Sequence, residues 1–114
     1  MATPADLPRA VTAFLKTHVG DMVQLKFLLT MHSAPGATMS ISMMSRALDV
    51  PATRGRELAA DAMRRGLVRV TGDQIELAPT TIDDRLALAD LAYWYGRDRT
   101  VILDALRALG ASGL

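Results

Sequence analysis

The sequence contains no cysteine, few aromatic residues and no long apolar run. Without cysteine the chain can form neither a disulfide nor a thiolate metal site, and a reducing cytoplasm fits this composition. No apolar stretch approaches the ~20 residues that a membrane-spanning helix needs, so we expect no membrane partner. The opening MATPADLPRA has neither a charged start nor an apolar run, and we therefore expect no signal peptide.

Sequence motifs of catalysis and of metal binding are missing too. The chain has no glycine-rich phosphate loop and no nucleophile motif. His18 and His32 lie on different predicted helices without a carboxylate cluster beside them, so we expect packed or helix-end histidines rather than metal ligands. Asp83 and Asp84 point apart on a helix, and acidic residues are favourable in a first helical turn in any case. The sequence thus predicts no enzyme activity, no metal and no cofactor.

The chain does contain enough apolar sequence for one small domain, together with a local excess of arginine. It has 114 residues, of which 50% are hydrophobic, and a net charge of only +1. Between Ser42 and Thr71, however, six arginines stand against three acidic residues, which is a local excess of +3. Arginine suits bidentate contacts with phosphate and with guanine, so this segment is a candidate nucleic-acid surface. A solvated charged face is the alternative explanation.

Apolar residues recur at helical spacing through most of the chain, which predicts six helices. Residues that favour helix starts precede three of them: Asp21 before the second, Ser40 or Ser42 before the third, and Asp98 before the last. Gly96 is expected to end the fifth helix. The predicted helices span about residues 7–19, 22–32, 42–49, 52–65, 80–95 and 99–109.

A β-hairpin is predicted between the fourth and fifth helices, in the segment VRVTGDQIEL. Apolar and polar residues alternate on both sides of Gly72–Asp73, which is the pattern of two short strands joined by a two-residue turn. The segment TMSI, before the third helix, is long enough only for a strand fragment. Folded on the turn, the hairpin pairs Val68 with Leu77, Arg69 with Glu76 and Val70 with Ile75.

This order of helices and strands is that of a winged helix-turn-helix, and the residues agree with it. The segment SISMMSRALDVPATRGRELAADAMRRGLVRV resembles bacterial winged helix-turn-helix transcription regulators of the broad MarR-like type. The likeness covers about residues 22–78. The matching positions are Ser42, Ser45, Leu48, Val50, Pro51, Ala52, Thr53, Leu58, Ala62, Gly66, Leu67 and Val68. The departures from the usual pattern are Met43, Asp49, Gly55, the small Ala62 and a short wing.

The resemblance implies a mainly α-helical fold with a small β-hairpin, in a single domain over residues 1–114. The winged helix-turn-helix core would lie at about 22–78, and extra terminal helices at about 7–19 and 81–110 would join two protomers. The implied function is that of a sequence-specific regulator of transcription that binds double-stranded DNA as a homodimer. Its expected location is the cytoplasm, in association with the nucleoid.

In this motif the helix at about 52–65 lies in the major groove, with its N-terminal residues toward the bases. Thr53, Arg54 and Arg56 lie at that end, where arginine can reach guanine or phosphate. Gly55 has two open explanations, a first turn that tolerates glycine or a backbone that approaches DNA closely. The predicted DNA-binding residues are Ser42, Arg46, Thr53, Arg54, Arg56, Arg64, Arg65 and Arg69, of which Arg46, Arg64, Arg65 and Arg69 are expected on phosphates.

The fifth helix is apolar on more than one side, which predicts a second protomer against it. One apolar stripe runs from Ile82 to Tyr93 and another from Leu88 to Tyr95. One stripe can cover the chain's own core, and the other would leave a large apolar patch in water unless a copy of the chain covers it. The predicted dimer-interface residues are Leu7, Val11, Leu88, Leu91, Tyr95, Ile102, Leu106 and Leu109.

Two other functions stay open on the sequence alone. The same fold can serve as a protein-protein interaction or adapter module, in which the basic face is incidental. A third interpretation is a ligand-responsive regulator with a small-molecule effector near Tyr93–Tyr95, where three consecutive aromatic residues cannot all face one core.

Overall fold

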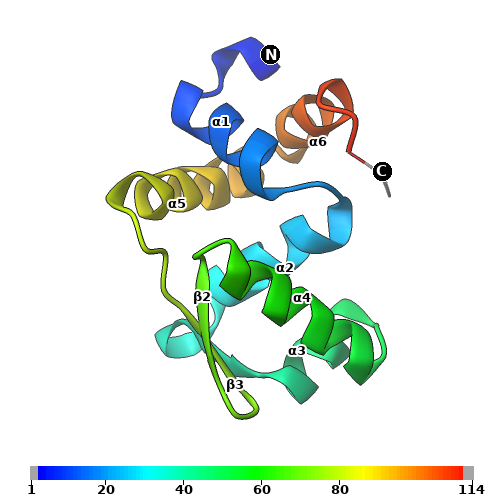
Figure 1. Ribbon diagram of the computed structural model, residues 1–114. Coiled ribbons are helices and arrows are strands. Elements are labelled where there is room, and N and C mark those ends of the chain that lie inside the picture. The colour runs from blue at the N-terminus through cyan, green and yellow to red at the C-terminus, as the bar shows by residue number, and fades with distance from the viewer. Residues whose placement is uncertain (1–2, 112–114) are drawn as a thin grey trace. The chain divides into compact units, whose positions relative to one another are not determined.

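The structure is a computed structural model that describes residues 3–111, and the chain divides into two compact units (Figure 1). The terminal unit comprises the chain up to Leu25 and from Ile82 onward, and the central unit comprises Lys26–Thr81. Over the described residues the chain is mainly helical with one small antiparallel sheet. The elements are the 3-10 helix Pro4–Asp6, α1 (Arg9–His18), α2 (Met22–Ser33), the 3-10 helix Pro35–Ala37, β1 (Thr38–Ser40), α3 (Ile41–Leu48), α4 (Ala52–Arg64), β2 (Val68–Thr71), β3 (Gln74–Leu77), α5 (Ile82–Arg97) and α6 (Arg99–Ala108).

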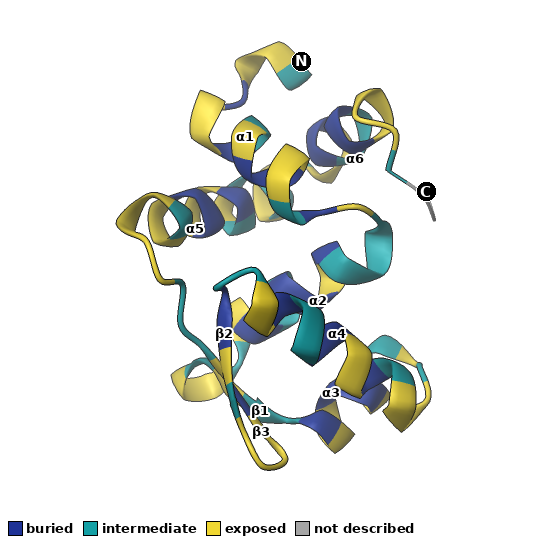
Figure 2. Cartoon of the chain, in the orientation of Figure 1, coloured by how far each residue is buried: buried dark blue, intermediate teal, exposed yellow. Residues whose placement is uncertain are grey.

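In the terminal unit, α1, α5 and α6 pack on one another around an apolar core. Each helix turns one apolar stripe inward, because its buried residues recur every three or four positions (Figure 2). The 3-10 helix Pro4–Asp6 lies against α6 and precedes the buried Leu7. The buried apolar residues of these three helices are Val11, Phe14, Leu15, Ala87, Leu88, Leu91, Val101, Ile102, Ala105 and Leu106.

In the central unit, α3 packs on α4, and α4 packs on β2. The strand order in the sheet is β1-β3-β2, with antiparallel neighbours throughout. The hairpin predicted from the sequence is confirmed, since Val68 pairs with Leu77, Arg69 with Glu76 and Val70 with Ile75. The strand fragment before α3 is confirmed too, because Thr38–Ser40 pairs with β3 as an edge strand.

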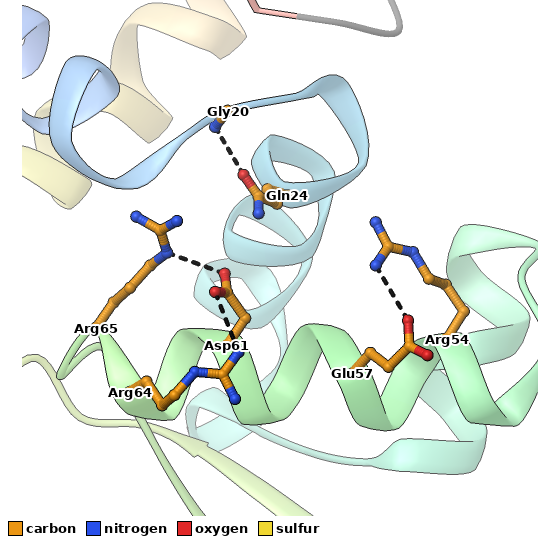
Figure 3. Close-up of polar contacts among 7 residues, drawn as sticks. All are labelled: Gly20, Gln24, Arg54, Glu57, Asp61, Arg64 and Arg65. Carbon is orange, nitrogen blue, oxygen red and sulfur yellow. Dashed lines mark hydrogen bonds and ion pairs between the residues drawn. The ribbon is translucent and has the colours of Figure 1, made fainter.

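Two predicted helix caps are present as hydrogen bonds. The Asp21 carboxylate accepts from the backbone N–H of Gln24 at 2.8 Å, and the Gln24 side chain accepts from the N–H of Gly20 at 2.6 Å (Figure 3). Of the two candidates before α3, Ser40 is the cap, since its hydroxyl accepts from the N–H of Met43 at 3.1 Å. Such caps satisfy backbone donors that a helix start leaves without partners.

One sequence expectation about helix boundaries was wrong, and another was met only in part. Gly96 does not end α5, which continues to Arg97. A helical glycine costs only ~1 kcal/mol relative to alanine, and the N–H of Asp98 still donates to the Trp94 carbonyl at 2.7 Å, which continues the helical hydrogen bonds past Gly96. Asp98 stands at the cap position of α6 but makes no side-chain cap bond. His32 is exposed in the last turn of α2, which is the helix-end placement among the two that the sequence left open.

The structure buries the apolar stripe of α5 that we predicted for the dimer interface, and it exposes the other stripe. Leu88 and Leu91 face the core of the terminal unit, whereas Ile82, Leu86 and Tyr93 are 70%, 60% and 58% exposed. Both stripes are apolar, so the sequence could not show which one α1 and α6 would cover. Six of the eight predicted interface residues, Leu7, Val11, Leu88, Leu91, Ile102 and Leu106, are buried within the single chain, while Tyr95 is half-buried and Leu109 is 39% exposed.

Candidate nucleic-acid interface

The turn between α3 and α4 fixes how these two helices meet. Asp49 ends α3 in the left-handed region, with φ 56° and ψ 50°, a conformation that aspartate tolerates better than most residues. The N–H of Val50 donates to the carbonyl of Ser45 at 2.9 Å, which closes the last turn of α3. Pro51 then precedes the first residue of α4, where its missing N–H costs nothing. The short turn therefore positions α4 directly against α3.

Gly55 is the point of closest approach between α3 and α4, and it is buried. A Cβ at this position would collide with the Ser45 hydroxyl and lie 3.5 Å from the Cγ2 of Ile41. The Ser45 hydroxyl is itself buried and donates to the Ile41 carbonyl at 2.8 Å. Neither sequence explanation for Gly55 holds, because its lack of a side chain serves the packing of α4 on α3.

The outward face of α4 is polar and carries most of the candidate residues. The inward face consists of Gly55, Leu58, Ala59 and Ala62, all buried. On the opposite face, Thr53, Arg56, Glu57 and Arg64 are exposed, so buried and exposed residues alternate along the helix in Figure 2. This division follows from the 100° turn per residue in a helix.

Two acidic residues on α4 pair with three of its arginines, as Figure 3 shows. Arg54 lies 3.4 Å from Glu57, with 40% and 67% of the two side chains exposed. Asp61 receives Arg65 at 2.9 Å and Arg64 at 3.5 Å. Surface ion pairs of this kind contribute only ~0–1 kcal/mol. A phosphate can therefore replace the carboxylate at little cost.

The remaining candidate cations differ in their partners. Arg69 on β2 lies 3.1 Å from Glu76 on β3, directly across the hairpin. Arg46 on α3 and Arg56 on α4 are exposed, and within residues 3–111 neither makes an ion pair. The central unit also contains Asp73, at the hairpin tip, and Glu76. Its seven basic and five acidic side chains therefore give a net charge of +2, which is lower than the +3 of residues 42–71 alone. All eight predicted DNA-binding residues lie in this unit, seven of them on α3, α4 and β2 and Arg65 at the C-cap of α4.

Glu57 is a candidate site residue that the sequence reasoning passed over. Its side chain is 67% exposed and lies on the same stripe of α4 as Thr53, four positions before it, and Arg64, seven positions after it. The spacing alone could have placed Glu57 in the middle of the outward face. An acidic side chain there restricts which nucleic-acid groups the face can accept.

The tip of the hairpin is tied to the start of α3. The N–H of Ile41, the first residue of α3, donates to the carbonyl of Asp73 at 2.9 Å. Gly72 takes φ 60°, as the first position of such a two-residue turn requires. Ile75 on β3 is fully buried, and the tip carries no arginine or lysine. The hairpin therefore has a structural role in closing the central unit.

A second polar site lies in the terminal unit, between α1 and α5. His18 Nε2 lies 3.4 Å from Asp84 Oδ2, beside an open hollow of about 530 Å³. From the sequence we expected His18 to be a packed or helix-end histidine and Asp84 to be an acidic residue at a helix start. The two residues are far apart in the sequence, so no local pattern could predict that they pair. Within the described residues, no group of three or more potential ligands could hold a metal ion. Over the same residues, no helix combines the length and the apolar character needed to cross a membrane.

Comparison with known proteins adds no relative for this chain. No protein-family model matches the sequence, and no curated protein does. The residues and their arrangement therefore have to support any functional proposal on their own.

Proposed function

We propose that the central unit is a winged helix-turn-helix and that the protein is a cytoplasmic regulator of transcription that binds double-stranded DNA as a homodimer. The observation that carries the proposal is the outward face of α4. This helix packs on α3 through Gly55 and turns Thr53, Arg56 and Arg64 to solvent, with Arg54 on its flank. A polar helix face of this width matches the major groove, which admits one α-helix.

The N-terminal end of α4 is the end that reads bases in this proposal. Arg56 has no ion pair within the described residues, so it can reach a guanine edge without giving one up. Arg54 exchanges its contact with Glu57 for DNA at small cost. Thr53 is exposed at the first turn and supplies a hydroxyl. The partial positive charge of the helix start adds to the attraction for phosphate.

The other candidate residues position the helix on the duplex. Ser42 and Arg46 are exposed on α3, which crosses the backbone in this motif. Arg64 is 70% exposed at the C-terminal end of α4, and Arg69 is 69% exposed on β2. These side chains, with Arg65, contact phosphates, which adds affinity without sequence preference.

Glu57 gives the proposed interface its selectivity. Carboxylates repel phosphate but accept a hydrogen bond from the N4 amino group of cytosine. Because Glu57 lies between Thr53 and Arg64, it disfavours every register of α4 that would bring phosphate to the middle of the face. Loss of its charge should therefore raise binding to unrelated sequences.

A protein-protein adapter is the second candidate function, and the ion pairs favour it. Four of the six arginines on the candidate face pair with Glu57, Asp61 or Glu76. A face of mixed charge suits a protein partner as well as DNA. Salt dependence separates the two functions, because the release of counterions from each contacted phosphate makes DNA affinity fall steeply with salt.

Selection from random duplexes tests the proposed function. The full chain should enrich one sequence, repeated with two-fold symmetry at a spacing of about one DNA turn, ~34–36 Å. The matched control is a chain with Arg54→Ala and Arg56→Ala, which should enrich nothing. Failure of the wild type to enrich any sequence, with its helical circular dichroism intact, would favour the adapter.

A further inference from the structure

The solvent-facing side of α5 is an apolar stripe that nothing in the terminal unit covers. Ile82, Leu86 and Tyr93 are 70%, 60% and 58% exposed, and Ala89 between them is exposed as well. The spacings of four, three and four residues are those of a seam between two packed helices. Three large apolar side chains in one line on a helix mark a contact with another surface.

The charges on one flank of this stripe are separated by sign along the helix, which bears on the choice of partner. Asp83, Asp90 and Arg97 are spaced by seven residues, so they line one flank of the stripe. Within residues 3–111, none of these three makes an ion pair, whereas Asp84 pairs with His18. The Arg97 guanidinium donates only to the Tyr93 hydroxyl, at 2.8 Å. One end of the flank is therefore acidic and the other end is basic.

The acidic end of the flank borders the hollow between α1 and α5. Asp83, Leu86 and Asp90 line it from α5, and Ala10 and Ala13 line it from α1. The small alanine side chains leave room for a large residue, and the volume of about 530 Å³ can hold an aromatic ring. A side chain that combines an aromatic ring with a cation beside it would complement both the apolar floor and the acidic rim.

We propose that a second copy of this chain covers the stripe, with the two α5 helices antiparallel about a two-fold axis near Ala89. Tyr93 of the second copy then enters the hollow, and its Arg97 meets Asp83. The inference names the contact surface of the homodimer proposed above, and so it rests on that proposal. It replaces the interface predicted from the sequence, most of which is buried within one chain.

The position of the hollow favours the antiparallel orientation over the parallel one. In a parallel pair, Tyr93 would lie level with its own copy, ~10 Å along the helix from the middle of the hollow at Leu86 and Ala87. The flank with Asp83, Asp90 and Arg97 would then lie across the seam from its own copy, so Asp83 could not meet Arg97. In the antiparallel pair, Asp83 meets Arg97 twice, once on each side of the axis. Only the two Asp90 side chains near the axis then oppose each other. The substitution Asp90→Asn should therefore tighten the dimer.

The first test measures the molar mass of the full chain without DNA by sedimentation equilibrium. The wild type should be a dimer at micromolar concentration, and Leu86→Glu should be a monomer. Leu109→Glu is the matched control, since Leu109 is also exposed but lies at the end of α6. That variant should remain a dimer. A monomeric wild type, or a dimer that survives Leu86→Glu, would overturn the inference.

A charge exchange tests the proposed contact itself. Asp83→Arg and Arg97→Asp should each weaken the dimer roughly tenfold, because the two-fold axis makes every substitution act twice. The double variant Asp83→Arg/Arg97→Asp restores both contacts and should regain the affinity of the wild type to within a few-fold. A double variant as weak as either single variant would contradict the pairing.

Disulfide crosslinking tests the orientation, because the chain has no cysteine of its own. Ala89→Cys, near the axis, should crosslink two copies on oxidation. Ile82→Cys should not, since an antiparallel pair centred near residue 90 separates the two copies of residue 82 by ~24 Å along the helix. Crosslinking of Ile82→Cys, with or without that of Ala89→Cys, would overturn the antiparallel arrangement. A monomeric chain that still selects DNA through α4 would overturn the inference and leave the DNA-binding proposal standing.

Discussion

The helices α4 and α5 expose faces of opposite character, and the two units that contain them differ in the same direction. The central unit has a net charge of +2, and α4 turns arginines, a threonine and one glutamate to solvent. The terminal unit has six basic and seven acidic side chains, a net charge of −1, and α5 turns Ile82, Leu86 and Tyr93 to solvent. A charged face is stable in water by itself, whereas an apolar stripe is not. This difference supports both proposals, a polyanionic partner for the central unit and a second copy of the chain for the terminal unit.

Two helical glycines sharpen this comparison and give the largest expected effect on stability. Gly55 in α4 is buried against Ser45, whereas a Cβ at Gly96 in α5 would meet nothing within 4 Å. Gly55→Ala should destabilise the fold by ~1–3 kcal/mol through overpacking, and Gly96→Ala should stabilise it by ~0.5–1 kcal/mol. Urea unfolding of the two variants measures both changes. Equal effects at the two positions would refute the account of how α4 meets α3.

A second substitution shows whether the Ser45 hydroxyl causes the strain. Removing it in Ser45→Ala/Gly55→Ala should recover part of the loss caused by Gly55→Ala, because the hydroxyl is the atom that the added methyl group meets first. If the double variant were no more stable than Gly55→Ala alone, the strain would have to be assigned to the next contacts of the added methyl group, the Cβ of Ser45 at 3.3 Å and the Cγ2 of Ile41 at 3.5 Å.

The arginines at the two ends of α4 should affect DNA binding differently. Arg56→Ala should cost ~1–3 kcal/mol on the selected duplex and relax the preference at one base pair. Arg64→Ala should weaken all duplexes alike and lower the salt slope by about one unit. Titrations at several salt concentrations, on selected and random duplexes, separate these outcomes. If Arg56→Ala weakened binding equally on every duplex, Arg56 would have to contact a phosphate rather than a base.

Glu57→Gln should have a smaller effect, and of opposite sign. Removing the charge leaves the size of the side chain unchanged and frees Arg54 from its carboxylate partner at 3.4 Å. Binding to random duplexes should rise a few-fold, while the preference for the selected duplex falls. A titration with unrelated DNA checks the first part. Unchanged or weaker binding there would mean that Glu57 does not face the duplex.

Asp73→Ala should have the smallest effect. The tip of the hairpin lacks cations, and the carbonyl of Asp73, not its side chain, accepts the hydrogen bond from Ile41. DNA affinity should therefore change less than two- to threefold, within the usual ±0.5 kcal/mol of surface substitutions. A tenfold loss with the circular dichroism spectrum intact would show that the tip enters a groove.

Local patterns in the sequence were sufficient to predict the elements but not the way they pack. The alternation around Gly72–Asp73 predicted the hairpin register correctly, because a two-residue turn leaves only one pairing that buries Ile75 and Val68 together. The cap at Asp21 was likewise a local signal. By contrast, the role of Gly55 depends on Ser45 ten positions away, on another helix, and no periodicity reports that contact.

The candidate sites show the same limit. Arg54, Arg56 and Arg64 could be proposed from their places on one predicted helix, and the structure leaves them on its exposed side or flank. The interface residues of α5 could not be chosen correctly, since two apolar stripes look equivalent until α1 and α6 cover one of them. The contact of Arg69 with Glu76, by contrast, agrees with the hairpin register that the sequence predicted.

The most direct test of the DNA-binding account compares two double variants in one salt titration. Arg54→Ala/Arg56→Ala removes charge from the start of α4, and Arg97→Ala/Arg107→Ala removes the same charge from the terminal unit. Both are measured on the duplex selected by the wild type. We predict that the first variant loses the selected duplex by at least a hundredfold, while the second binds it within a few-fold of the wild type when the dimer is held together by the Ala89→Cys disulfide. Equal binding by Arg54→Ala/Arg56→Ala and the wild type would contradict the claim that α4 reads DNA.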